Sequence, residues 1–518
     1  MTDDRDDAVQ TTPAIMTLKA LLPEGLKSLP QPLRRALERD DYSTALSLAN
    51  KAYAEKGAQD KIAPLTYAIL LVGRDLVDEA MGVLRRALTY HAQDVSLQLA
   101  QVEALMVDTN FEAAMALMEG LRSVSTAEPR HWSFLGDMYL DLGREEDAID
   151  CYERAIEMGS RSVEVAFRLG HLLLDRDELS RAARHFEYAA RLAPNNALVW
   201  ETTADVLLQL GEIEQAIYAY TRVLKFDAHN ARTWMYLGLA YQEAETLDKA
   251  MEAFERVVAL EPENAFAWIQ LGHMQMGLGY PEQALQSYRK AAALEPENID
   301  ALKGAVGAAF ELGDMAEAEQ LAHEAVRRKP DEAETHYSLG VVMLALRRPA
   351  EALLALTRAV EGDPHQAAFL ASLALSELML GESEPAHVHI HQAVALGVES
   401  NSLMAFTEEL LKTGSYDQAL SFLRDVNNDE PTWRVVVPML AFLSLGLKRE
   451  RALLAEQIAD FITTLRAQPQ VVPVMWDFEE LDRLAMRLEA ELRKIFVLMI
   501  GVVEGRKDLE NFESKSNL

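Results

Sequence analysis

Three histidines, at positions 387, 389 and 391, combine the residue type and the spacing that a metal site would need. In the stretch HVHIH, His387 and His391 lie four residues apart, which places both on one face of a helix where they could bind one ion. No cysteine cluster supplies further ligands. We therefore expect no metal and predict that these histidines lie on a solvated helix surface.

Cys151 is the single cysteine of the chain and the other candidate for reactive chemistry. A single cysteine excludes a disulfide within the chain and is typical of a reducing compartment. Nothing in the sequence indicates a basic environment that would activate its thiol. Glycine loops that bind phosphate, nucleophile elbows and HExxH motifs are also absent. We therefore predict that the protein is not an enzyme and binds no cofactor.

The composition is strongly acidic, with 82 Asp and Glu against 50 Lys and Arg and a formal net charge of −32. This balance argues against nucleic acid or an anionic membrane as the main partner, because both are bound through clustered basic residues. The longest apolar run, 495–503, is far shorter than the roughly 20 residues that cross a bilayer. The acidic start, MTDDRDDAV, does not read as a secretory signal. We predict a cytoplasmic protein without direct membrane insertion.

The element that organises the chain is a unit of 34 residues, seen most clearly at 231–264. Apolar residues at unit positions 4, 7 and 11, and again at 20, 24 and 27, form one stripe on each of two helices. Small residues at positions 8 and 20 would let these helices approach closely, and proline at position 32 would end the second helix. The unit is therefore predicted to be a helical hairpin. Its residues at positions 4, 7, 8, 11, 20, 24 and 32 are Trp234, Leu237, Gly238, Tyr241, Ala250, Phe254 and Pro262.

The same register continues over eight units, and alanine occupies position 20 in every one. The units start at 129, 163, 197, 231, 265, 299, 333 and 367, and the alanines are Ala148, Ala182, Ala216, Ala250, Ala284, Ala318, Ala352 and Ala386. After them the period slips by one residue to a unit at 400–433. The pattern resembles the tetratricopeptide repeat. That resemblance implies an all-α protein, a right-handed superhelix of about 12 stacked hairpins, which binds peptides or proteins on its inner face.

Three regions are predicted. Residues 1–25 form an acidic, partly disordered lead-in in which AIMTLKALL could make two helical turns, and residues 26–433 form the repeat solenoid. Residues 434–518 form a helical C-terminal cap that ends in an amphipathic helix over 477–503. Two roles for that helix remain open, because it could cap the array or fold back into the groove.

The resemblance also implies that positions 2, 5, 9, 12 and 13 of each first helix line the groove that binds a partner. Across 129–264 these positions are acidic, with few opposing charges, and across 265–400 they are mostly apolar. The predicted groove residues are Asp137, Asp141, Glu164, His171, Asp175, Glu201, Asp205 and Glu243 in the acidic half, and Phe266, Ile269, His273, Lys303, Tyr337, Val341, Leu375 and Met379 in the apolar half.

We therefore predict a scaffold or adaptor whose groove binds a protein or peptide with basic and apolar segments. The alternative function is a cargo chaperone that keeps an aggregation-prone or secreted client soluble through the apolar half. The acidic half could also be a merely solvated face. The sequence makes no prediction about the oligomeric state or the identity of the partner.

Overall fold

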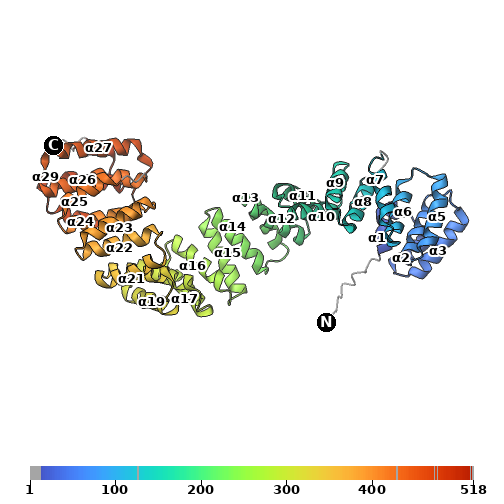
Figure 1. Ribbon diagram of the computed structural model, residues 1–518, viewed down its shortest axis with the longest axis horizontal. Coiled ribbons are helices and arrows are strands. Elements are labelled where there is room, and N and C mark those ends of the chain that lie inside the picture. Colours follow the sequence, from blue (N-terminus) through green and yellow to red (C-terminus); the bar gives the residue numbers. More distant parts are fainter. Residues whose placement is uncertain are drawn as a thin grey trace. The chain divides into compact units, whose positions relative to one another are not determined.

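The computed structural model describes residues 13–124, 128–426, 430–471, 473–474, 476–513 and 515. Its contacts divide the chain after Thr246 into two units, and each unit is built from consecutive helical hairpins (Figure 1). Apart from one short extended segment, β1, the elements of the described residues are helical. The predicted all-α repeat fold is confirmed.

Unit 1 begins with a helix and an extended segment that stand outside the hairpin series, and then continues through six hairpins and one further helix. Its elements are α1 (Pro13–Leu21), β1 (Pro23–Leu26), α2 (Gln31–Glu38), α3 (Tyr42–Lys56), α4 (Ile62–Val72), α5 (Val77–Tyr90), α6 (Val95–Val107), α7 (Phe111–Leu121), α8 (Pro129–Asp141), α9 (Glu145–Glu157), α10 (Val163–Asp175), α11 (Leu179–Leu192), α12 (Ala197–Gln209), α13 (Ile213–Leu224) and α14 (Ala231–Glu243).

Unit 2 continues the hairpin series and ends in shorter helices. Its elements are α15 (Leu247–Leu260), α16 (Ala265–Gly277), α17 (Pro281–Leu294), α18 (Ile299–Glu311), α19 (Met315–Arg328), α20 (Ala333–Ala345), α21 (Pro349–Gly362), α22 (Ala367–Met379), α23 (Ser383–Ala395), α24 (Ser400–Lys412), α25 (Tyr416–Asp425), α26 (Pro431–Lys448), η1 (Arg451–Leu453), α27 (Leu454–Ala467), η2 (Pro469–Val471), α28 (Glu479–Ala485), α29 (Ala490–Val503) and α30 (Leu509–Glu513).

The predicted register of the repeats is confirmed. Every first helix of the regular units begins at the residue where the sequence pattern places position 1, and the next one begins at Ser400, after the predicted slip of one residue. One cause of this precision is local, because in several repeats the side chain at position 34 caps the following helix. Ser162, Asn196, Asn230 and Asn264 each accept a hydrogen bond from the backbone amide three residues later.

In several hairpins the two helices approach closely because glycine at position 8 faces the large side chain at position 24. A Cβ added to Gly136 would lie 2.6 Å from a ring carbon of Tyr152, and one added to Gly170 would lie 2.7 Å from Phe186. The alanine at position 20 is fully buried in all eight regular units. The ring at position 24 therefore fills the space that the two small residues leave.

Successive hairpins are joined by a hydrogen bond from the ring at position 4. The indole Nε1 of Trp200 donates to the carbonyl of Pro194 at 3.0 Å, and that of Trp268 donates to Pro262 at 2.9 Å. Both acceptors occupy position 32 of the preceding repeat. The tryptophans, which the pattern predicts to be packing residues, thus also donate to a backbone carbonyl in the loop that follows a second helix.

The turn inside each hairpin requires a left-handed backbone at position 15. Five of the eight regular repeats have glycine there, as at Gly143, and φ is positive at each of these five glycines. Asp177, Glu245 and Arg347 occupy the same position with φ of 61°, 54° and 56°. Because an L side chain is disfavoured in this conformation, the three residues are locally strained.

The two ends of the chain differ from the prediction. The amphipathic helix predicted over 477–503 is wrong as a single helix, because it is interrupted between α28 and α29. The stretch AIMTLKALL does form a helix, α1, but Leu18 and Leu21 lie in the hydrophobic core. Residues 1–12 lie outside the described part of the chain. Among the described helices, none combines the length and the apolar character of a membrane span.

Replacing Gly272 with alanine tests the close approach of the helices. The new Cβ would lie 2.6 Å from a ring carbon of Tyr288, so the Gly272→Ala variant should unfold about 1–3 kcal/mol more easily in chemical denaturation. Gly307 is the matched control, because it lies in the next first helix and has no atom within 4 Å of an added Cβ. Gly307→Ala should be slightly stabilising. Equal effects of the two substitutions would contradict the proposed packing.

Candidate functional site

The predicted groove residues lie on the first helices, and contacts between these helices show that they share one surface. Arg168 of α10 binds Asp137 of α8 at 2.6 Å, and Tyr337 of α20 stacks on Phe369 of α22 with ring centroids 4.7 Å apart. We call the surface formed by positions 2, 5, 9, 12 and 13 of the first helices the first-helix face. It is described separately for each unit.

In unit 1, the acidic side chains at position 9 accept hydrogen bonds from buried tyrosines. Tyr152 and Tyr220 are the buried rings at position 24, and their hydroxyls donate to Asp137 at 2.5 Å and to Asp205 at 2.7 Å. In the repeat between them, position 24 is Phe186 and position 9 is His171, whose rings meet edge to face. Asp137 and Asp205 are therefore acceptors for tyrosine hydroxyls at the edge of the core.

Two arginines form ion pairs with part of the predicted acidic surface, and each reaches a carboxylate on the preceding first helix. Arg168 binds both Asp137 and Glu164 at 2.6 Å, and Arg232 binds Glu201 at 3.3 Å and Asp205 at 3.0 Å. Burial raises the pKa of Asp137, and the hydrogen bonds from Tyr152 and Arg168 oppose that rise. Four of the seven predicted carboxylates are thus already paired.

Arg168, which forms ion pairs with two of the predicted groove carboxylates, is not among the residues that the sequence predicts for this face. It occupies position 6, which the family pattern does not assign to the groove, but it lies four residues after Glu164 on the same helix. That spacing was the available signal. Three predicted carboxylates, Asp141, Asp175 and Glu243, remain exposed at the C-terminal ends of α8, α10 and α14. We call these three the acidic edge.

In unit 2, the first-helix face is apolar as predicted, with one correction. Phe266 is 47% exposed, whereas Ile269 is only 4% exposed and belongs to the core. Ile269 is buried because its side chain packs into the cluster that includes Ala284 and Leu302. Among the other predicted residues, His273 is exposed and Lys303 is bound by Asp300 and Glu334. We call the half-exposed and exposed apolar residues here the apolar patch: Phe266, Tyr337, Val341, Leu375 and Met379.

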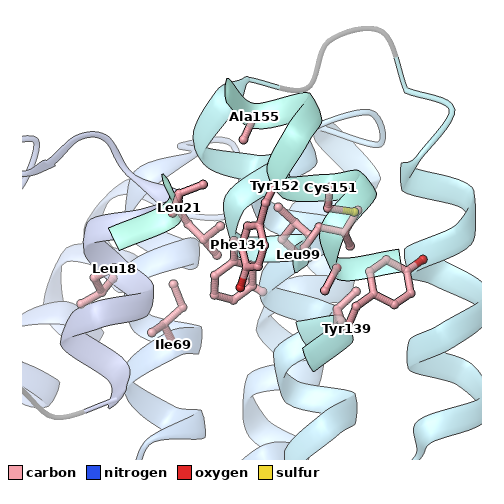
Figure 2. Close-up of a cluster of buried hydrophobic side chains, with 14 of the residues drawn as sticks. Leu18, Leu21, Ile69, Leu99, Phe134, Tyr139, Cys151, Tyr152 and Ala155 are labelled. Carbon is pink, nitrogen blue, oxygen red and sulfur yellow. The ribbon is translucent and has the colours of Figure 1, made fainter. Parts of the chain in front are cut away.

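At the start of unit 1, helix α1 covers the first-helix face of three successive hairpins. It packs against α4, α6 and α8, which are all first helices. Figure 2 shows Leu18 and Leu21 of α1 in one cluster with Ile69 of α4, Leu99 of α6 and Phe134 of α8. Ile69 and Leu99 occupy groove positions 9 and 5 of their repeats. The chain therefore places one of its own helices where the family would bind a partner.

The contact between α1 and α6 contains a buried carboxylate. Thr17 donates to Oε1 of Glu103 at 2.5 Å, while Oε2 of Glu103 is buried without a hydrogen-bond partner among the described residues. Burial raises the pKa of Glu103 to about 7. Glu103 occupies position 9 of its repeat, the position of Asp137 and Asp205, but no tyrosine hydroxyl or arginine binds it within the described chain.

A second series of hydrogen bonds holds the C-terminal end of α1. It lies next to an open cavity of about 730 Å³, whose lining includes Lys61, His91 and Arg130. The amide of Glu128 donates to Nδ1 of His131 at 3.0 Å, so Nε2 carries the proton and donates to Ser96 at 2.9 Å. Ser96 then donates to the carbonyl of Leu21. Burial lowers the pKa of His131 to about 4. This serine–histidine pair is directed away from general-base chemistry, because the histidine has no free lone pair to accept the serine proton.

Helices α28 and α29 cover the first-helix face at the other end of unit 2. Helix α28 packs against α24, and α29 packs against α26, with the rings of Phe442 and Phe496 stacked 6.5 Å apart. Met404 and Leu411, at groove positions 5 and 12 of α24, are buried in the same cluster as Leu484. The C-terminal segment therefore lies against α24 and α26.

The candidate chemical residues take structural roles. His389 is bound by the buried carboxylate of Glu377 at 2.8 Å, and His387 contacts the carbonyl of Ser383. Within the described residues, no group of three or more His, Cys, Asp or Glu could hold a metal ion. Burial raises the pKa of Cys151 to about 12, so its thiol stays protonated at neutral pH.

The repeats and their shared face define a helical-hairpin repeat protein, and comparison with known families agrees. Family models described as tetratricopeptide repeat match residues 99–163, 135–197, 231–274 and 275–339, and one described as TPR repeat matches 204–245. The chain is a tetratricopeptide repeat protein. Proteins of this class serve protein–protein interactions and are generally not enzymes.

Curated relatives match only short segments. The cell division cycle protein 27 homolog of Caenorhabditis elegans is 34% identical over 88 residues, which are 17% of this chain and 11% of that protein. Human tetratricopeptide repeat protein 34 is 28% identical over 120 residues, or 23% of this chain and 21% of that protein. The matched segments thus span a small part of either relative.

Solved structures resemble parts of the fold. The MamA structure is 23% identical to this chain. The match covers 33% of this chain and 93% of the MamA chain, with a TM-score of 0.31. YrrB, described as a TPR protein with an unusual peptide-binding site, is 23% identical, with coverages of 36% and 97% and a TM-score of 0.32. The Cut9–Hcn1 structure is 15% identical, with coverages of 92% and 99% and a TM-score of 0.37.

The structural role of position 9 is tested by replacing Asp137 with alanine. Asp137→Ala leaves the hydroxyl of Tyr152 without its acceptor and removes one of the two carboxylates that bind Arg168, so it should lower the free energy of unfolding by about 1–3 kcal/mol. Asp141→Ala, four residues later on the acidic edge, should change it by less than about 0.5 kcal/mol. Urea denaturation of both variants gives the comparison. Equal stability of the two would mean that the Asp137 contacts contribute nothing.

The buried Glu103 should make stability depend on pH. Its pKa of about 7 in the folded protein lies above the ordinary value of 4.5, so between these pH values the folded protein holds a proton that the unfolded chain releases. Its contribution should be fully present below about pH 4.5, decline as the pH rises to about 7 and stay constant above that, a loss of up to about 3 kcal/mol. Chemical denaturation at pH 5 and at pH 8 gives the free energy of unfolding at each pH. The difference between these two values should be smaller for Glu103→Gln than for the natural chain. Identical pH profiles would contradict the assignment.

Proposed function

We propose that this protein is a scaffold that docks partner proteins on the uncovered part of its first-helix face. The observation that carries the proposal is the apolar patch of unit 2. Its side chains project from α16, α20 and α22, which lie before the helices covered by α28 and α29. Contiguous exposed apolar residues on a monomer commonly mark a binding surface.

The apolar patch suits an amphipathic helix or an extended segment with apolar anchors. Phe266 offers an exposed ring, and the stacked Tyr337 and Phe369 provide a rigid base for an apolar side chain. Aromatic anchors of this kind carry much of the affinity in protein interfaces. Lys303 lies between these helices, but its ammonium is already paired with Asp300 and Glu334.

Unit 1 contributes a separate and weaker preference for basic segments. The acidic edge lies at helix C-termini, where the helix dipole adds to the negative charge and favours cations. Asp137, Glu164, Glu201 and Asp205 add less to this preference, because Arg168 and Arg232 each bind two of them and offset half of their charge. Selection of partners with basic segments should therefore depend mainly on the three carboxylates of the acidic edge.

The alternative function, a chaperone that holds an apolar client, would use the apolar patch of unit 2.

The proposal is tested with a displayed library of helical peptides selected against the full chain. Selected peptides should lose at least about tenfold in affinity for a Phe266→Asp variant, measured by fluorescence anisotropy, because the change places a charge in the apolar patch. Leu354→Asp is the matched control, since Leu354 is 72% exposed but lies on the second helix α21. Equal affinity for the two variants would contradict docking on the first-helix face.

A further inference from the structure

We propose that the first-helix face of α4, α6 and α8 is a second docking site, which α1 occupies and from which an amphipathic helix of a partner protein displaces it. The partner helix carries an apolar stripe like that of α1 and a basic side chain that reaches Glu103. This site is separate from the apolar patch of unit 2, so the two proposals stand or fall independently.

The occupied site shows the shape of ligand that it accepts. Helix α1 is only nine residues long, and Ile15, Leu18 and Leu21 follow one another at intervals of three on its buried side. They pack on side chains at groove positions, including Leu65 and Ile69 of α4. A short helix with this stripe therefore binds here in the manner of a partner peptide, although it belongs to the same chain.

The polar contacts show that α1 is an incomplete ligand. Glu103 receives one hydrogen bond from Thr17 through Oε1, whereas its buried Oε2 has no partner in the described structure. A buried carboxylate oxygen without a donor loses the hydrogen bonds that water would give it, which is destabilising. A helix that brings an ammonium to Oε2 would remove this cost and form a charge-assisted hydrogen bond. The carboxylate therefore favours a basic helix over α1.

The position for that basic group can be read from α1. Ala20 lies three residues after Thr17, on the same side of the helix, and it is only partly buried. A lysine at position 20 would extend towards the N-terminus of the helix, over the turn that contains Thr17, because helical side chains lean in that direction. Met16 is the matched control position, since it is 53% exposed and faces away from the core.

The test uses a labelled peptide of residues 13–26 and the full chain, with binding measured by fluorescence anisotropy. Leu18→Asp in the full chain should release α1, because it places a charge in the core cluster, and should raise the affinity for the peptide at least tenfold. A peptide with Ala20→Lys should bind about three- to tenfold more tightly than one with Met16→Lys, which has the same net charge. Glu103→Gln in the full chain should abolish that difference.

A second measurement covers the case in which Leu18→Asp disturbs the fold. With the natural full chain, a saturating amount of the Ala20→Lys peptide should speed hydrogen exchange at the amides of α1 and leave exchange in α10 to α13 unchanged. A bound peptide that leaves α1 protected would overturn the proposal. So would equal binding of the two lysine peptides, or a dimer of the natural chain formed by exchange of α1, which would assign the site to a second copy.

Discussion

The close approach of the two helices within each hairpin is the constraint on which the rest of the fold depends. In most of the regular repeats a small residue at position 8 and alanine at position 20 leave a space that the large side chain at position 24 fills. Because protein interiors tolerate little overpacking, this contact fixes how the helices of a hairpin cross. The same crossing in each hairpin gives the first helices a shared face, which is the part of the molecule available to partners.

The core also determines part of the chemistry of that face. When the side chain at position 24 is tyrosine, its hydroxyl emerges at the first helix and needs an acceptor, and Asp137 and Asp205 provide one. When it is phenylalanine, as at Phe186, no acceptor is needed and His171 packs against the ring. An acidic residue at position 9 is therefore a consequence of the core as much as a feature of the binding surface.

The repeat register, the close crossing and the first-helix location of the predicted residues could be read from the sequence, because each depends on residues within one unit or in two neighbouring units. The pairing of Asp137 and Asp205 could not, since it requires knowing that Arg168 and Arg232 reach back from the next helix. The burial of α1 was also missed, because Leu18 meets Ile69 and Leu99 across long stretches of chain and no periodic pattern connects them. Each end of the chain folds back onto nearby first helices, and these contacts determine which parts of the first-helix face remain open.

The hydrogen bond from the ring at position 4 to the carbonyl at position 32 has a consequence for how such a chain can change its length. Each bond joins two consecutive repeats and involves no residue elsewhere, as with Trp200 and Pro194 or Trp268 and Pro262. Removing or duplicating a segment of one whole period would reconnect a donor with an equivalent acceptor at the new junction. A gain or loss of any other length would separate them, so repeats joined by this bond should be gained or lost whole.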